Sequence, residues 1–150
     1  MTRKNPQDVM QVINILKFRG MLDDFDIVPI ENKSEAEVAQ IMRDSLIFLS
    51  FSYAEGFSLP AAEAMACGSI VIGYHGMGGK EFFDPAFSYP IQNADIIAFA
   101  QAVEEVIKEY NNNPHIFEKK GQQASEYILK TYTTEKEKED IRTFWNEICG

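Results

Sequence analysis

The chain has 150 residues, 45% of them hydrophobic and 25% charged, so it can form one globular domain with a substantial core. Its 23 acidic and 14 basic residues give a net charge of −9, and such a surface repels nucleic acid. The two cysteines suggest neither a disulfide framework nor a metal-binding pair, and the sequence shows no signal peptide and no membrane-spanning run. We therefore expect a cytoplasmic protein with one domain over residues 1–150 and with no nucleic-acid partner.

The first predicted element is a helix that begins at Asn5 and ends at Gly20. Asn5 can cap its first turn, and Pro6 suits the first helical position. Residues 25–30 (FDIVPI) are then predicted to form a short strand. The apolar stripe of the helix, at helical spacing, consists of Val9, Val12, Ile13 and Leu16.

A capping box of Ser34 and Glu37 begins the next predicted helix. The continuous apolar run at residues 46–51 favours a strand buried on both faces, as in a parallel sheet covered by helices. The pattern that follows predicts a helix over 60–67 that ends at Gly68, a strand over 69–73 and a weaker strand over 87–90.

The last third of the chain is predicted to be helical. Asn93 begins a helix that ends at residues 111–113, and Pro114 begins the next one. A second capping box, Thr134 with Glu137, begins the last helix. The chain therefore has a helical C-terminal tail.

Strands that alternate with helices predict an α/β fold, a Rossmann-like doubly wound parallel sheet. The chain opens on a crossover helix with no strand ahead of it, so we expect the domain to lack its first strand and to be truncated on its N-terminal side. An open sheet edge of this kind favours pairing with another chain, which suggests a homo-oligomer.

Glu55, Gly56 and a helix start at Pro60 follow the predicted strand at the edge of the sheet where ligands bind. Free N–H groups ahead of Pro60 and the positive end of the helix dipole attract a diphosphate. Glu63 lies about one turn inside the helix, where a carboxylate can accept hydrogen bonds from the hydroxyls of a ribose. Because its neighbours in the helix are apolar, Glu63 is expected to be buried, and a buried carboxylate needs a partner or a ligand.

Residues 55–60 (EGFSLP) and 63–68 (EAMACG) place two glutamates with seven residues between them. This pattern resembles the E-x7-E signature of family-4 retaining glycosyltransferases, in the C-terminal domain of their GT-B fold. The resemblance extends more loosely over most of the chain. It implies a hexosyltransferase-type enzyme that takes a nucleotide-diphosphate sugar as its sugar donor and retains the stereochemistry of the sugar. No metal or other cofactor is required in that family.

The resemblance also implies roles for individual residues. Glu63 would hold the ribose hydroxyls, and Glu55, the catalytic candidate, would contact the sugar near its reacting face. In the family an Arg and a Lys stabilise the departing diphosphate, and the candidates here are Arg3 and Lys4, at a tighter spacing than usual. The backbone that would bind sugar and diphosphate belongs to Gly56, Phe57, Ser58 and Leu59.

A glycine-rich loop at residues 73–81 (GYHGMGGKE) follows the next predicted strand. The family has a glycine-rich loop ending in Glu at this place, close to the sugar donor, so His75, Gly78 and Gly79 are further binding candidates. A plain flexible loop is the alternative. The pair Asp24 and Asp26 mimics a metal-binding D-x-D motif, but it lies at the wrong end of the sheet, and we predict no metal site.

In GT-B enzymes the C-terminal helix commonly packs toward the other domain, so Phe144 and Trp145 could lie in an interface. Core packing is the alternative, and we favour it.

Three functions are consistent with the sequence. The first is the nucleotide-sugar-binding domain of a retaining glycosyltransferase, inactive without an acceptor domain that lies in another chain or in a missing segment. The second is a non-catalytic module that binds a nucleotide or nucleotide-sugar. The third, an unrelated flavodoxin-like interaction domain, would make the paired glutamates accidental.

Overall fold

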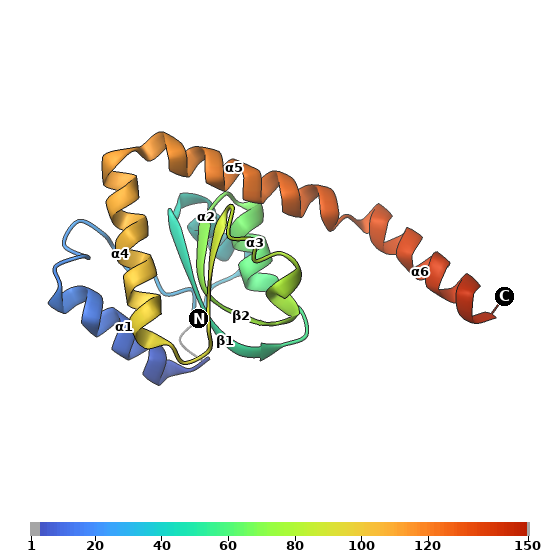
Figure 1. The fold of residues 1–150 in the computed structure, drawn as a ribbon. Helices are drawn as coiled ribbons and strands as arrows, with labels where there is room; N and C mark the ends of the chain where they lie inside the picture. Colours follow the sequence, from blue (N-terminus) through green and yellow to red (C-terminus); the bar gives the residue numbers. More distant parts are fainter. Residues whose placement is uncertain (1–3, 150) are drawn as a thin grey trace.

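A computed structural model describes residues 4–149, which fold around a three-stranded parallel sheet (Figure 1). The strands lie in the order β1 (Ile47–Glu55), β2 (Ile70–Met77) and β3 (Ser88–Ile91). Helix α3 (Leu59–Ala66) connects β1 to β2, and a short 3-10 turn, η1 (Gly78–Glu81), follows β2. The α/β, Rossmann-like class predicted from the sequence is confirmed.

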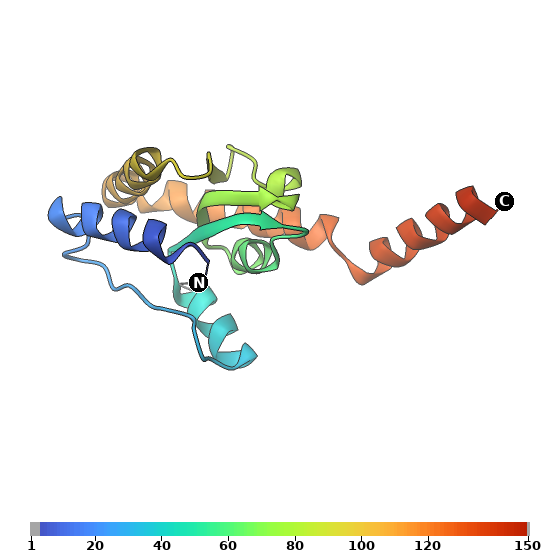
Figure 2. The same cartoon turned by 90° about the horizontal axis from the view of Figure 1, so that it is seen from below.

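Helices cover both faces of this sheet, as a doubly wound fold requires. Two views at right angles place α1 and α4 on one side of the strands and α3 on the other (Figures 1 and 2). The remaining bounds are α1 (Pro6–Phe18), α2 (Glu35–Asp44), α4 (Ile96–Asn112), α5 (Pro114–Thr131) and α6 (Thr134–Cys149). None of the helices in the described part of the chain combines the length and the apolar character needed to cross a bilayer.

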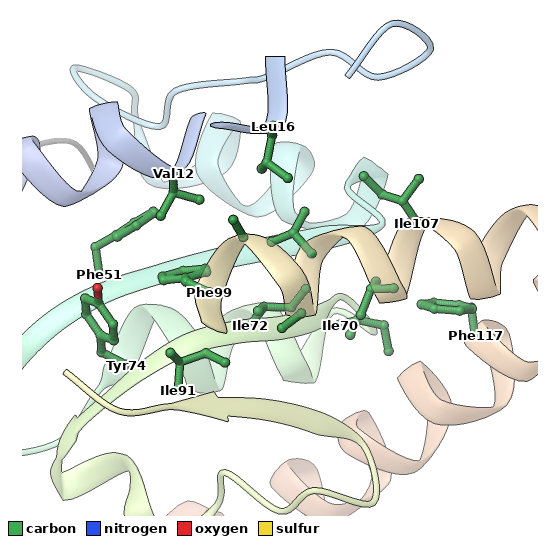
Figure 3. Close-up of a cluster of buried hydrophobic side chains, with 14 residues drawn as sticks. Val12, Leu16, Phe51, Ile70, Ile72, Tyr74, Ile91, Phe99, Ile107 and Phe117 are labelled. Carbon is green, nitrogen blue, oxygen red and sulfur yellow. The ribbon is translucent and has the colours of Figure 1, made fainter. Parts of the chain in front are cut away.

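The alternating side chains of β2 divide the core into two clusters. Ile70 and Ile72 face α1 and α4, where Phe99 and Val12 complete the larger cluster (Figure 3). Val71 faces the opposite way and packs in a second cluster with residues of α2, α3 and α5. A strand that begins with apolar residues at consecutive positions and points them alternately to both faces is the expected centre of such a sheet.

β1 is only half-buried over residues 47–49, and it becomes fully buried at residues 50–52. The expectation of a strand buried on both faces is therefore correct only for its second half. β1 lies at the end of the strand order, so one of its edges has no neighbouring strand among the described residues.

The strand predicted at residues 25–30 is wrong, because this segment forms no strand. A strand is stabilised by the ladder it makes with a neighbour, and the sheet order places no strand of the described chain beside this segment. Ile27 and Val28 consequently remain 48% and 52% exposed.

The caps of the first two helices differ in how well the sequence predicts them. Ser34 and Glu37 form the predicted capping box at α2. Asn5 occupies the N-cap of α1, but its side chain makes no cap hydrogen bond. Its amide instead donates to the carbonyl of Phe51, at 2.6 Å, and so joins the start of α1 to β1.

The last helix, α6, begins as predicted but with a different cap. The hydroxyl of Thr133 accepts from the backbone N–H of Lys136 at 3.0 Å, so the predicted capping box of Thr134 and Glu137 is off by one residue. The charged side chains of residues 135–140 are exposed, as predicted.

Helix α6 extends away from the rest of the molecule, and none of its described residues is buried (Figures 1 and 2). Phe144 and Trp145 contact each other, with ring centroids 6.2 Å apart, and are 57% and 56% exposed. Core packing, which the sequence favoured for Phe144 and Trp145, is therefore wrong, because no described residue of α6 is buried.

Candidate functional site

The two segments that the sequence singled out meet at the carboxyl ends of β1 and β2. Glu55, the last residue of β1, lies opposite Met77, the last residue of β2, after a register shift in the ladder. In doubly wound sheets ligands bind at this edge. The fold therefore places residues 55–60 and the glycine-rich loop beside each other.

The side chain of Glu55 has two partners here. It forms an ion pair with Lys4, and its other oxygen accepts a hydrogen bond from the hydroxyl of Ser58 at 3.1 Å. The Glu55 side chain is 15% exposed and that of Lys4 is 39% exposed, so the pair lies at the rim of the site. Arg3, the other predicted cation, lies outside the described residues. The structure thus brings Lys4, Glu55 and Ser58 into contact, whereas the sequence pointed to them as separate candidates.

Ser52 lies beside this group and was not predicted from the sequence. Its side chain is buried, and its hydroxyl has no hydrogen-bond partner among the described residues. A small cleft of about 20 Å³ is lined by Ser52 together with Lys4, Glu55 and Ser58. Buried hydroxyls are normally paired, so this one is suited to a ligand atom. No sequence pattern distinguishes Ser52 from the other small residues of the strand.

The glycine-rich loop packs directly on the turn after β1. A β-carbon added to Gly78 would stand 1.6 Å from the carbonyl oxygen of Gly56, so only glycine fits at position 78. Gly79 is buried, and a β-carbon added to it would stand 3.2 Å from the ring of Phe83. A plain flexible loop, the alternative considered above, would not make such close contacts.

His75 is partly buried at the end of β2. Its Nδ1 atom accepts from the backbone N–H of Met77 at 3.1 Å, which leaves Nε2 to carry the proton of the neutral ring. Burial lowers the pKa of His75 from its ordinary value of 6.5, and the charge of Lys80 lowers it further. A neutral imidazole at this place can donate one hydrogen bond from Nε2.

Helix α3 begins at Leu59, with Ser58 at its N-cap. The N–H of Leu59 donates to the carbonyl of Phe57 at 2.9 Å, so this group ahead of Pro60 is not free, although the sequence predicted free N–H groups here.

Glu63 is exposed, and the expectation of a buried carboxylate is wrong. The residues of α3 that face the core are Ala61, Ala62, Ala64 and Met65. These side chains suffice to bury one face of the helix, and Glu63 lies on the opposite face. Because Glu63 is exposed, its carboxylate does not need a partner or ligand to offset burial of its charge.

An aromatic cluster packs against the turn after β1. The ring of Phe57 packs on Tyr132, with centroids 5.1 Å apart, and on Phe82, at 5.2 Å. The hydroxyl of Tyr132 donates to the carboxylate of Glu81 at 3.4 Å, and that of Tyr127 donates to the Glu81 carbonyl at 3.1 Å. Sequence reasoning missed both tyrosines, which lie far downstream on α5 and at its end.

Asp24 and Asp26 line a groove beside the first half of β1, away from the site described above. Within the described residues no group of three or more His, Cys, Asp or Glu side chains could hold a metal ion.

Comparison with known proteins identifies the family. The family model described as "Glycosyl transferases group 1" matches residues 7–124. A curated relative, an alpha-1,6-glucosyltransferase of Actinobacillus pleuropneumoniae serotype 7 (strain AP76), is 34% identical over 97 residues. That stretch covers 61% of this chain and 29% of the relative, so the chain spans less than a third of that protein. No solved structure matched. The chain belongs to the group 1 glycosyl transferases.

Proposed function

We propose that this chain binds the sugar donor, a nucleotide-diphosphate sugar, at the carboxyl ends of β1 and β2, for transfer of a hexosyl group with retained stereochemistry. The observation that carries the proposal is the joint placement of Lys4, Glu55 and Ser58 beside the unpaired hydroxyl of Ser52. A cation, a carboxylate and two hydroxyls at the ligand edge of the sheet can bind a sugar and its phosphates.

Each residue has a proposed role. Lys4 neutralises charge on the departing diphosphate, as preplaced cations do in transition states. Glu55 contacts the sugar near its reacting face, and Glu63, exposed on α3, accepts hydrogen bonds from the ribose. His75 donates from Nε2 to the sugar or a phosphate. The backbone of residues 56–59 and of Gly78 and Gly79 forms the wall of the site.

We further propose that the chain does not transfer sugar alone. It spans 29% of the glucosyltransferase relative, and an acceptor needs a second binding surface, in another chain or in a further segment. A non-catalytic nucleotide-sugar-binding module is the second candidate. It is favoured by the engagement of Glu55 with both Lys4 and Ser58, which leaves this carboxylate less free for chemistry.

Calorimetric titration with UDP, GDP and ADP and their glucose conjugates tests the proposal. We expect saturable binding of one base, and we expect Glu63→Ala to abolish it. Glu147→Ala, an exposed glutamate on α6, is the matched control and should bind normally. If no ligand binds to a chain whose amide spectrum shows that it is folded, the proposal is wrong. Turnover of a glucose conjugate by the chain alone would contradict the expected inactivity.

A further inference from the structure

The first turn of α1 is held on the sheet by polar side chains that lie outside the proposed donor site. The carboxylate of Asp8 accepts from the hydroxyls of Tyr53 on β1 and Tyr74 on β2, and the bond from Tyr74 is 3.0 Å long. Both hydroxyls bond to the same oxygen, Oδ2. The Asn5 amide donates to the carbonyl of Phe51, also on β1, at 2.6 Å. Asp8 and Asn5 therefore join α1 to two neighbouring strands, toward their carboxyl ends.

The two tyrosines lie in different surroundings, but both keep their protons for the bond to Asp8. Tyr74 is fully buried, and the half-buried Tyr53 packs against it, with ring centroids 5.2 Å apart. The bond to Asp8 raises the pKa of Tyr53, and burial together with this bond raises the pKa of Tyr74. Each hydroxyl therefore remains a donor at neutral pH. Because buried polar groups are normally paired, removal of the Asp8 carboxylate would take away the acceptor that Tyr74 needs.

Lys4 connects this network to the sugar-donor site. It precedes Asp8 by four residues, and its ammonium group forms the ion pair with Glu55 at the end of β1. Between Lys4 and the helix lies Asn5, with a φ of 50° and a ψ of 58°. This is the left-handed conformation, which Asn adopts more readily than most residues. The direction of the chain from α1 to Lys4 therefore depends on how the first turn is held.

The ion pair of Lys4 does not by itself determine where the chain ahead of α1 lies. An ion pair at the surface contributes little, because fixing two long side chains costs conformational entropy, and the Lys4 side chain is 39% exposed. The contacts of Asn5 and Asp8 attach the first turn to the strands whose ends also carry Glu55. A cation that is already in place for a developing charge stabilises it better than one that must first be brought there.

We infer that Asp8 is a positioning residue. The Tyr53 and Tyr74 hydroxyls bind its carboxylate and fix the first turn of α1 over the strand ends. The fixed turn holds the Lys4 ammonium group beside Glu55. The consequence for the diphosphate rests on the proposed function, whereas the placement of Lys4 does not. Separate measurements therefore test the two.

Zero-length cross-linking of the full chain tests the placement of Lys4 in the absence of nucleotide. A carbodiimide joins an amine to a carboxylate by an amide bond only where the two groups are in contact. We expect Asp8→Asn to lower the yield of the Lys4–Glu55 cross-link at least about three-fold, as coupled neighbours do. The yield for Lys136 and Asp140, an ion pair of 3.2 Å on α6, is the internal reference and should not change.

Tyr53→Phe and Tyr74→Phe should lower the same yield, because each removes one hydroxyl that binds Asp8. Tyr89→Phe is the matched control and should leave the yield unchanged. It also removes a tyrosine hydroxyl bonded to a carboxylate, that of Glu109 at 3.1 Å, but between β3 and α4. Should Asp8→Asn fail to fold, Tyr53→Phe decides, because Tyr53 is only half-buried.

A double-mutant cycle tests the consequence for the diphosphate. Calorimetry compares UDP, GDP and ADP with uridine, guanosine and adenosine. For the base that binds, Asp8→Asn should weaken the diphosphate about five-fold and leave the nucleoside unchanged, with no further loss in Lys4→Met. A purely structural role for Asp8 would instead weaken both ligands, and equally in the two backgrounds.

Two results would overturn the inference. One is a Lys4–Glu55 cross-link that forms as efficiently in Asp8→Asn as in the unaltered chain. The other is an equal loss of diphosphate affinity with and without Lys4. If no diphosphate binds the unaltered chain, the proposed function is wrong, and the cross-linking yield alone then decides whether Asp8 places Lys4.

Discussion

The carbonyl oxygen of Gly56 lies against the α-carbon of Gly78, so closely that no β-carbon fits between them. We expect Gly78→Ala to lower the free energy of unfolding by about 1–3 kcal/mol and to displace the loop from the turn after β1. Gly56→Ala is the matched control, because nothing lies within 4 Å of a β-carbon at that position. Denaturant unfolding of both variants checks this. Equal losses in the two would mean that the contact does not constrain the loop.

Ser52 gives a prediction in which stability and binding move in opposite directions. Its buried hydroxyl is unpaired among the described residues, so Ser52→Ala should leave the free energy of unfolding unchanged or raise it by up to about 1 kcal/mol. If the hydroxyl bonds to the sugar donor, the same change weakens binding. Ser50→Ala, in contrast, removes a bond to the Tyr74 carbonyl of 2.8 Å and should destabilise. Thermal unfolding and calorimetry on both variants provide the comparison.

Lys4 is expected to contribute more to the affinity for the diphosphate than to the stability of the fold. Its ion pair with Glu55 is partly exposed, so Lys4→Met should cost less than about 1 kcal/mol of stability. Affinity for the nucleoside diphosphate should fall about ten-fold, equivalent to ~1.4 kcal/mol, while the weak binding of the uncharged nucleoside stays the same. Lys17→Met, an exposed lysine on α1, is the control. Similar losses for nucleoside and diphosphate would argue against a phosphate contact.

Tyr132 should make the fold sensitive to alkaline pH. Burial raises its pKa from 10.0 to about 12, and the neighbouring Tyr127 and Glu81 add to the rise. The folded state therefore keeps a proton that the unfolded state has lost, so this contribution to stability is complete below pH 10 and declines as pH rises toward 12. Tyr53, Tyr74 and Tyr89 titrate in the same sense. Unfolding between pH 9 and 12 should show a smaller decline for Tyr132→Phe than for the unaltered chain.

His75 should titrate below its ordinary pKa of 6.5, chiefly because of burial and also because of Lys80. Since the unfolded chain takes up this proton first, the stability that the neutral ring contributes is present above pH 6.5 and declines as pH falls through the folded pKa. Proton NMR of the imidazole measures the shift. Lys80→Gln should raise the His75 pKa only slightly, and a complete return to 6.5 would show that charge, not burial, is the main cause.

The sequence predicted which segments lie together better than it predicted their burial and contacts. Glu55, Gly56 and the glycine-rich loop come together because each follows a parallel strand, and parallel strands end at one edge. The burial of Glu63 could not be judged from composition, since a helix of small apolar residues buries only the face that meets a neighbour.

Contacts between distant parts of the chain were beyond prediction. The strand expected at residues 25–30 requires a neighbouring strand, and local residue preference cannot show that none of the described strands lies beside it. Tyr132 reaches Phe57 only through the packing of α5 across α3, which no local pattern records.

The pairing of β1 with β2 has a consequence for how the chain folds. Residue 47 pairs with residue 70, and residue 71 with residue 88, so the ladders join positions that are near in the chain. Closing such short loops loses little chain entropy, which favours rapid formation of a nucleus from β1, α3 and β2. Helix α1, whose Val12 and Leu16 pack mainly on the α4 side of the core, would then dock onto a surface that already exists.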